Sequence, residues 1–126
     1  MSTAYYAMFH EVCFDYASFL VGSYRNAFDK DAWRRAYRSV GHGDLKDRSS
    51  NADLSAFCDQ VQLFAVKFVE MQQKRHLADY DPFIEFTRQA VLDDINQVED
   101  ALRQYRTVSA SQCRAFCAVL TGFKKR

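Results

Sequence analysis

Two arginines and a histidine recur at helical spacing in the first third of the chain. Arg35, Arg38 and His42 are three and four residues apart, so they share one helix face if the helix continues through Gly41. Arginine binds phosphate through forked hydrogen bonds, and histidine exchanges a proton near neutral pH. The three side chains could therefore bind a phosphodiester and cleave RNA without a metal, using the ribose 2′-hydroxyl as nucleophile. The alternative is that they form a solvated basic helix face.

A second polar group follows the longest apolar seam. The seam predicts a helix packed in a bundle, with Phe64 and Phe68 in one core with Val98 and Leu102. It consists of Leu54, Phe57, Val61, Phe64, Phe68 and Met71. Continuing the seam from Phe68 and Met71 by four residues reaches Arg75, and Asp79 and Tyr80 lie about one turn later. An arginine on a core-facing line needs a partner, because burial of an unpaired charge is costly. We expect a structural ion pair with Asp79 that orders the helix end. The alternative is that Arg75 faces a groove or a subunit interface.

The other histidines and the cysteines form no recognisable metal motif. His10 lies at the edge of an apolar stripe, and the four cysteines lie on or beside apolar positions without a CxxC pair. We interpret His10 as an edge residue with a satisfied hydrogen bond, rather than a ligand or base, and the cysteines as reduced, buried thiols. The sequence lacks a P-loop, a GxGxxG or HExxH motif and the Glu-x-x-His pairs of di-iron bundles. We therefore expect neither a metal nor a cofactor.

Composition predicts one helical domain spanning residues 1–126. The chain is 48% hydrophobic and contains one proline and four glycines, which favours long helices. Its net charge is +1, so a nucleic-acid site would have to be a local patch. No apolar stretch approaches the roughly 20 residues that span a bilayer, and no signal peptide is visible at the start. We expect a cytoplasmic protein without membrane contact.

Apolar residues recur at helical intervals along the whole chain. They predict an all-α, antiparallel four- to five-helix bundle. We expect Asp29 to cap the second helix, Asp81 to cap the fourth with Pro82 at its first position, and Ser109 with Gln112 to open the fifth. The expected helices cover about 5–21, 30–41, 54–80, 82–105 and 110–121.

Three segments, taken in order, resemble a known family. They are Ala4-Tyr5-Tyr6-Ala7-Met8-Phe9-His10, then Trp33-Arg34-Arg35-Ala36-Tyr37-Arg38 with His42 downstream, and then Arg75-His76-Leu77-Ala78-Asp79-Tyr80-Asp81-Pro82. Together they resemble the HEPN domain (higher eukaryotes and prokaryotes nucleotide-binding), and in particular its small prokaryotic stand-alone members. The match covers nearly the whole chain.

The resemblance implies a helical bundle that often pairs into homodimers. Many members are metal-independent endoribonucleases, often toxins paired with a nucleotidyltransferase-like antitoxin, and others are RNA-binding or scaffolding modules. Active members carry an Arg, four to six residues, then a His. Arg35 and His42 enclose six residues and meet that pattern, whereas Arg38 and His42 enclose three and do not. Members usually have a helix before the segment that starts here at Ala4, so the chain is either truncated or naturally short.

These observations predict a HEPN-like prokaryotic module that binds or cleaves RNA without metal, within a toxin–antitoxin or defence system. In the catalytic form His42 is the general acid/base, and Arg35 and Arg38 clamp the phosphate. The alternative is a non-catalytic, dimerising interaction module of the same fold. In that module Arg75 and Asp79 are structural, together with Tyr80.

Overall fold

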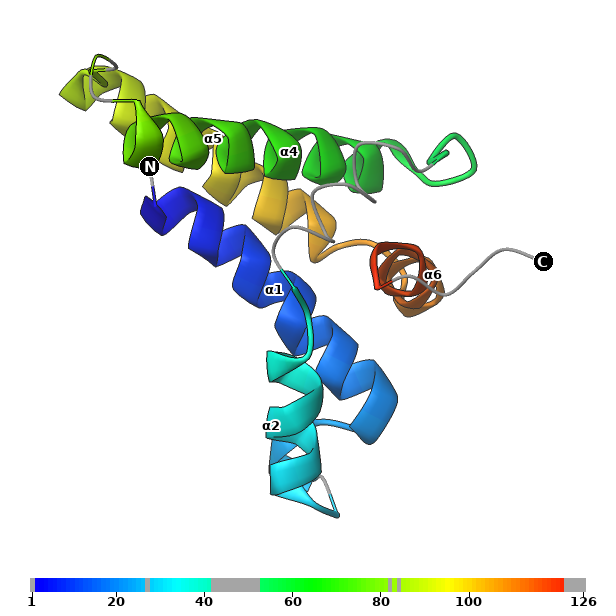
Figure 1. The fold of residues 1–126 in the computed structure, drawn as a ribbon. Helices are drawn as coiled ribbons and strands as arrows, with labels where there is room; N and C mark the ends of the chain where they lie inside the picture. The colour runs from blue at the N-terminus through cyan, green and yellow to red at the C-terminus, as the bar shows by residue number, and fades with distance from the viewer. Residues whose placement is uncertain (1, 27, 42–52, 82, 84, 122–126) are drawn as a thin grey trace.

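The computed structural model describes residues 2–26, 28–41, 53–81, 83 and 85–121 (Figure 1). Over these residues the chain forms five α-helices and one 3-10 helix, with no strand, which confirms the predicted all-α bundle. The elements are α1 (Ser2–Val21), η1 (Tyr24–Asn26), α2 (Lys30–Arg38), α4 (Asp59–Tyr80), α5 (Arg88–Tyr105) and α6 (Ala110–Leu120). No helix in this part of the chain is long and apolar enough to cross a membrane.

Helix α1 lies in the middle of the fold and contacts α2, α4, α5 and α6 (Figure 1). Its wide apolar stripe is therefore covered from several sides, and Tyr5, Met8 and Val12 are completely buried. Phe14 and Leu20 are the large apolar side chains that α1 leaves exposed. Neighbouring helices of the same chain bury this stripe, so its burial does not require a second subunit. The homodimer stays a prediction.

The main core forms where α4 and α5 pack on α1. Phe64 and Phe68 of α4 are buried with Val98 and Leu102 of α5, as the seam predicted. The Phe64 ring stacks on Tyr105 with ring centroids 4.4 Å apart. Such aromatic stacking adds about 0.5–1.5 kcal/mol to the apolar burial. The seam therefore determines how α4 and α5 face each other.

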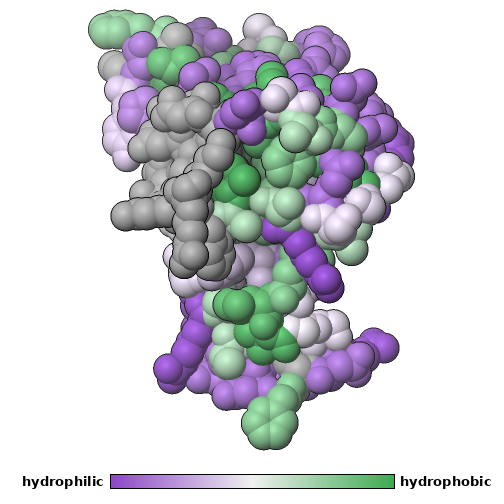
Figure 2. Space-filling view, turned by 90° about the vertical axis from the view of Figure 1, so that its right-hand side faces the viewer, coloured by the Kyte–Doolittle hydropathy of each residue, from purple (hydrophilic) through white to green (hydrophobic). Residues whose placement is uncertain are grey.

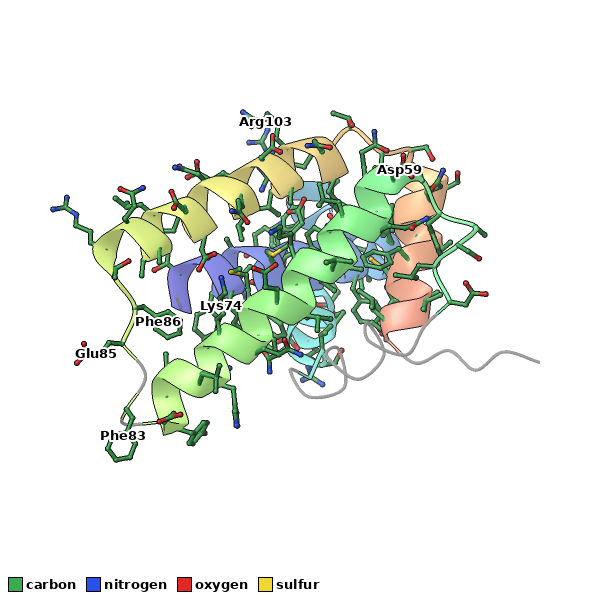
Figure 3. All side chains as sticks on the ribbon, turned by 90° about the horizontal axis from the view of Figure 1, so that it is seen from above. Asp59, Lys74, Phe83, Glu85, Phe86 and Arg103 are labelled. Carbon is green, nitrogen blue, oxygen red and sulfur yellow. The ribbon has the colours of Figure 1, made fainter. Side chains whose placement is uncertain are left out.

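Helices α4 and α5 lie side by side and are also tied by charge (Figure 3). Lys74 Nζ donates to Asp94 Oδ1 at 2.8 Å, and the Asp94 side chain is 7% exposed. A carboxylate buried this deeply needs a counter-ion, which Lys74 supplies. At the turn between the helices, Phe83 points away from the molecule (Figure 3).

Helix α2 and the adjoining half of α1 project from the rest of the bundle, and we call this part the arm (Figure 1). A separate small core holds the arm together, formed by Ala17, Trp33 and Ala36. Gly22 ends α1 with a φ of +102°, a conformation that side chains other than glycine rarely adopt. The Asp29 carboxylate accepts hydrogen bonds from the first backbone N–H groups of α2, as predicted for its N-cap.

The predicted start of the fourth helix at Asp81 and Pro82 was wrong. Helix α5 begins at Arg88, and the N-cap is Thr87, whose hydroxyl accepts from the Ala90 N–H at 3.1 Å. Asp81 instead ends α4, and its carboxylate accepts from the Phe83 N–H at 2.9 Å. The Asp81 side chain thus accepts from the backbone two residues later, which makes an Asx turn. This turn competes with helix capping for the same carboxylate. Pro82 lies outside the described residues.

Candidate phosphate-binding surface

The second helix ends four residues before His42. Ser39 closes it, because its N–H and its hydroxyl both donate to the Ala36 carbonyl, the latter at 2.7 Å. A shared face required the helix to continue through Gly41, and this condition is not met, so helical periodicity does not place His42 on the face of Arg35 and Arg38. His42 itself lies outside the described residues.

Arg35 and Arg38 both lie on the solvent side of α2. Arg35 Nε pairs with Asp31 Oδ2 at 2.8 Å, and the Arg35 side chain is 81% exposed. An exposed pair one turn apart contributes only about 0.3–0.5 kcal/mol, so a phosphate could displace Asp31. Arg38 is exposed and has no ion-pair partner among the described residues. The structure therefore brings these two predicted residues together on an accessible surface.

Two further cations, Lys30 and Arg34, extend this surface, and the sequence reasoning missed them. Lys30, Arg34 and Arg38 follow each other at intervals of four residues, which is about 6 Å along a helix. Arg34 Nη2 donates to the Tyr24 hydroxyl at 2.5 Å, and both Lys30 and Arg34 lie over the Tyr24 ring. The four-residue spacing in the sequence could have revealed them. We call the four exposed cations Lys30, Arg34, Arg35 and Arg38 the cationic ridge.

Stacked rings connect α2, which carries the ridge, to α1. Trp33 stacks on Tyr37 at 5.4 Å, Tyr37 on His10 at 5.9 Å, and His10 on Tyr6 at 6.0 Å. His10 Nδ1 also shares a hydrogen bond with the Tyr37 hydroxyl. Burial raises the pKa of Tyr37, with a smaller contribution from Cys13, so its phenol remains neutral. His10 is therefore an edge residue with a hydrogen-bond partner, as predicted, and these rings keep α2 in place on α1.

In Figure 2 the projecting lower part of the molecule carries an apolar patch bordered by hydrophilic side chains. The apolar part agrees with the exposure of Phe14, Leu20 and Phe28 in and next to the arm. A surface that combines exposed rings and cations suits a flexible, charged chain better than a small apolar ligand.

Arg75, Asp79 and Tyr80 form a different group, on α4. Arg75 Nε lies 3.7 Å from Asp79 Oδ2, so the predicted ion pair is present. The Arg75 guanidinium also lies 5.2 Å from the ring centroids of both Tyr5 and Tyr6. Tyr80 is exposed and contacts the His76 ring instead. The contacts of Arg75 are therefore those of a structural residue that links α4 to α1.

The three buried thiols, Cys13, Cys113 and Cys117, are poor nucleophiles and poor metal ligands. All four cysteines are free, and burial raises the pKa of Cys13 to about 12. Burial also raises the pKa of Cys117 and Cys113, so both stay protonated at neutral pH. The described residues contain no group of three or more His, Cys, Asp or Glu side chains that could hold a metal ion.

No protein-family model, curated protein or solved structure matches this chain. The resemblance to the HEPN domain therefore remains a hypothesis, and the function has to be argued from the site.

Proposed function

We propose that this chain is a HEPN-like RNA-binding module and that the cationic ridge of α2 contacts the RNA phosphates. The observation that carries the proposal is the concentration of exposed positive charge on one helix. Four cations and a single acid, Asp31, occupy the nine residues of α2, in a chain whose net charge is only +1. This is the local patch that a nucleic-acid site requires in a nearly neutral protein.

The geometry of the ridge suits a phosphate backbone. Lys30, Arg34 and Arg38 lie one helical turn apart, so they can contact successive phosphates along one strand. All four side chains of the ridge are exposed, so a phosphate could reach each of them. Stacking of Tyr37 on His10 of α1 limits motion of α2 and lowers the entropy that binding would cost. RNA rather than another polyanion is chosen because of the HEPN resemblance.

In the catalytic version of this proposal, the module also cleaves the RNA that it binds. Arg35 and Arg38 would hold the phosphodiester while His42 transfers the proton. The described residues contribute only the two arginines to that scheme. The homodimer and the nucleotidyltransferase-like antitoxin that the resemblance implies are further parts of this proposal, and the non-catalytic interaction module is its alternative.

Salt dependence of binding tests the ridge directly. A labelled single-stranded RNA of about 20 nucleotides would be titrated with protein and followed by fluorescence anisotropy at several salt concentrations. If the ridge neutralises about three phosphates, log K should fall with log salt with a slope of about −2. The variant with Lys30→Gln, Arg34→Gln and Arg38→Gln removes three charges and should lose most of that slope.

The control is Arg103→Gln on α5, a single change outside the ridge. The Arg103 side chain is 74% exposed and pairs with Asp100 at 2.8 Å. It should leave RNA affinity within about twofold of wild type, because it lies outside the ridge. Equal losses for both variants, or no binding at low salt by the wild type, would rule out the ridge as an RNA site.

A further inference from the structure

A surface groove of about 190 Å³ lies between the second half of α1 and helix α6. Three of its described lining residues come from α1 and three from α6, so the packing of α6 on α1 creates it. None of them belongs to the cationic ridge. The described lining consists of Tyr16, Phe19, Leu20, Arg114, Cys117 and Ala118.

Most of this lining is apolar and is supported from behind. The side chains of Tyr16 and Phe19 are partly buried and pack against the main core. Cys117 is 3% exposed, and burial raises the pKa of its thiol, which therefore stays protonated and uncharged. Leu20 is 60% exposed and leaves apolar surface in contact with water. Fixed apolar walls with uncovered surface favour the binding of an apolar group.

The one charged residue of the described lining is Arg114. Its guanidinium carbon lies 5.3 Å from the centroid of the Phe19 ring, so cation–π attraction holds it against a wall of the groove. In the part of the chain that the structure describes, Arg114 forms no ion pair. A guanidinium with free donors can bind a carboxylate through two parallel hydrogen bonds. Charge complementarity therefore selects an anion for this groove.

The size of the groove and its aromatic walls limit the occupant further. A protein cavity of ~150 Å³ holds one benzene molecule, so the groove accommodates a single ring with a short chain. Aromatic rings pack well on other aromatic rings in offset or edge-to-face geometry, which Tyr16 and Phe19 offer. A monoanion suits the site better than a dianion, because a single guanidinium compensates a single charge.

We propose that the groove between α1 and α6 binds a small aromatic monocarboxylate, with its ring against Phe19 and Leu20 and its carboxylate on Arg114. Burial of the ring supplies most of the binding free energy, and the guanidinium orients the ligand and selects its charge. This site does not depend on the RNA-binding proposal.

Titration with hydrocinnamate, a phenyl ring joined to a carboxylate by a two-carbon chain, tests the site. The isotope-labelled full chain would be followed by the NMR shifts of its backbone amides. A ligand of this size should bind with a Kd on the order of 1 mM. The shifts should saturate and should be largest in the second half of α1 and in α6. Hydrocinnamamide, in which a neutral amide replaces the carboxylate, should bind about fivefold more weakly.

Arg114→Gln separates recognition of the charge from packing of the ring. It should weaken hydrocinnamate about fivefold and leave hydrocinnamamide within about twofold of its wild-type affinity, so that the variant no longer prefers the acid. Arg114 is exposed, so the variant should fold. The control is Arg103→Gln, also the loss of one exposed arginine but outside the groove, and it should keep the preference. An undiminished preference for the acid in Arg114→Gln would overturn the proposal.

Leu20→Ala tests the apolar wall at a position that the fold does not need, because the Leu20 side chain is 60% exposed. It should weaken the acid and the amide alike, by about threefold or more. Unchanged affinities for both ligands would show that the ring binds elsewhere and would contradict the proposal.

Two further arms distinguish other occupants. Hexanoate carries the same charge without a ring and should bind several-fold more weakly than hydrocinnamate, and equal affinity would overturn the aromatic assignment. Dilution of the protein without ligand should leave the groove shifts unchanged, whereas a shift there would show a second copy in the groove and would refute the small-molecule site. Lack of saturable binding up to about 10 mM hydrocinnamate would also refute it.

Discussion

His10 in α1 and Tyr37 in α2 are joined both by a hydrogen bond between Nδ1 and the phenol hydroxyl and by stacking of their rings at 5.9 Å. The pair lies where the arm leaves the bundle, and it links two helices that are 27 residues apart at this point. The small core around Trp33 also attaches α2 to α1. The position of the cationic ridge therefore depends on the His10–Tyr37 pair.

Tyr37→Phe should weaken the arm more than the bundle. The change keeps the ring that stacks on His10 and Trp33 but removes the hydroxyl, at a cost of about 0.5–1.5 kcal/mol. Trp33 is the only tryptophan and lies in the arm, so its fluorescence reports on the arm during urea unfolding. Its transition should shift to lower urea, and unchanged midpoints by both fluorescence and circular dichroism would contradict the prediction.

Phe68→Ala should destabilise the main core by about 3–5 kcal/mol, through lost burial and the cavity that remains. Phe68 is 1% exposed and belongs to the cluster that contains Phe64, Val98 and Leu102. Val66→Ala is the matched control on the same helix, because Val66 is 63% exposed and should change stability by less than about 0.5 kcal/mol. A loss below about 1 kcal/mol for Phe68→Ala would show that the core is misassigned.

Arg75→Ala should cost about 1–3 kcal/mol in the free energy of unfolding. The guanidinium contacts the rings of Tyr5 and Tyr6 and pairs with Asp79, so the change removes three contacts at once. Arg75→Lys should recover only part of the loss, because an ammonium keeps the charge but lacks the planar stacking surface. If Arg75→Ala is as stable as wild type yet loses RNA binding, Arg75 belongs to the functional surface instead.

Stability should fall as pH rises through the range in which Asp15 ionises. The pKa of Asp15 is about 7 in the folded state, against 3.8 for an unperturbed aspartate, so the folded state binds the proton more tightly than the unfolded state. The free energy of unfolding therefore decreases from about pH 4 to about pH 7 and then levels off. With allowance for partial solvent access, the loss from this group should be about 2–3 kcal/mol. Asp15→Asn should remove it, which urea unfolding at several pH values would measure.

If the protein cleaves RNA, cleavage should need no divalent metal and should depend on His42. The products should carry a cyclic phosphate, because the 2′-hydroxyl is the expected nucleophile. General acid/base catalysis contributes about 10²–10⁴-fold, so His42→Ala should lower the rate by that order. The assay is RNA incubated with EDTA, wild type beside His42→Ala. Equal cleavage by both, or none by either, would leave the non-catalytic module as the better explanation.

Features within about one helical turn were predictable from the sequence. The caps at Asp29 and Ser109, the end of α1 at Gly22 and the seam through Phe64 and Phe68 were all correct. Each depends on backbone groups or side chains a few residues away, so the residue types contain the necessary information. The cationic ridge was also visible in the sequence as a four-residue spacing of basic residues, but only Arg35 and Arg38 were recognised.

Prediction from local sequence failed for short polar side chains that can form either of two local structures. Asp81 can cap a following helix or close a turn, and the structure has the turn. Gln112 lies at the position of a capping box, and Ser109 does accept from its N–H. The Gln112 side chain, however, accepts a hydrogen bond from the Cys58 N–H at 2.9 Å, which ties the start of α6 to that of α4.

Contacts between distant segments were decided only by the tertiary structure. The sequence by itself determined that Arg75 needs a partner, and helical spacing pointed to Asp79, but the rings of Tyr5 and Tyr6 come from another helix. Likewise, nothing local distinguishes Asp15 from an ordinary exposed aspartate. Its pKa is raised by burial and by Glu11, against the effects of Tyr105 and Arg106 from the end of α5. Burial of this kind depends on packing angles and helix offsets, which are collective properties of the folded chain.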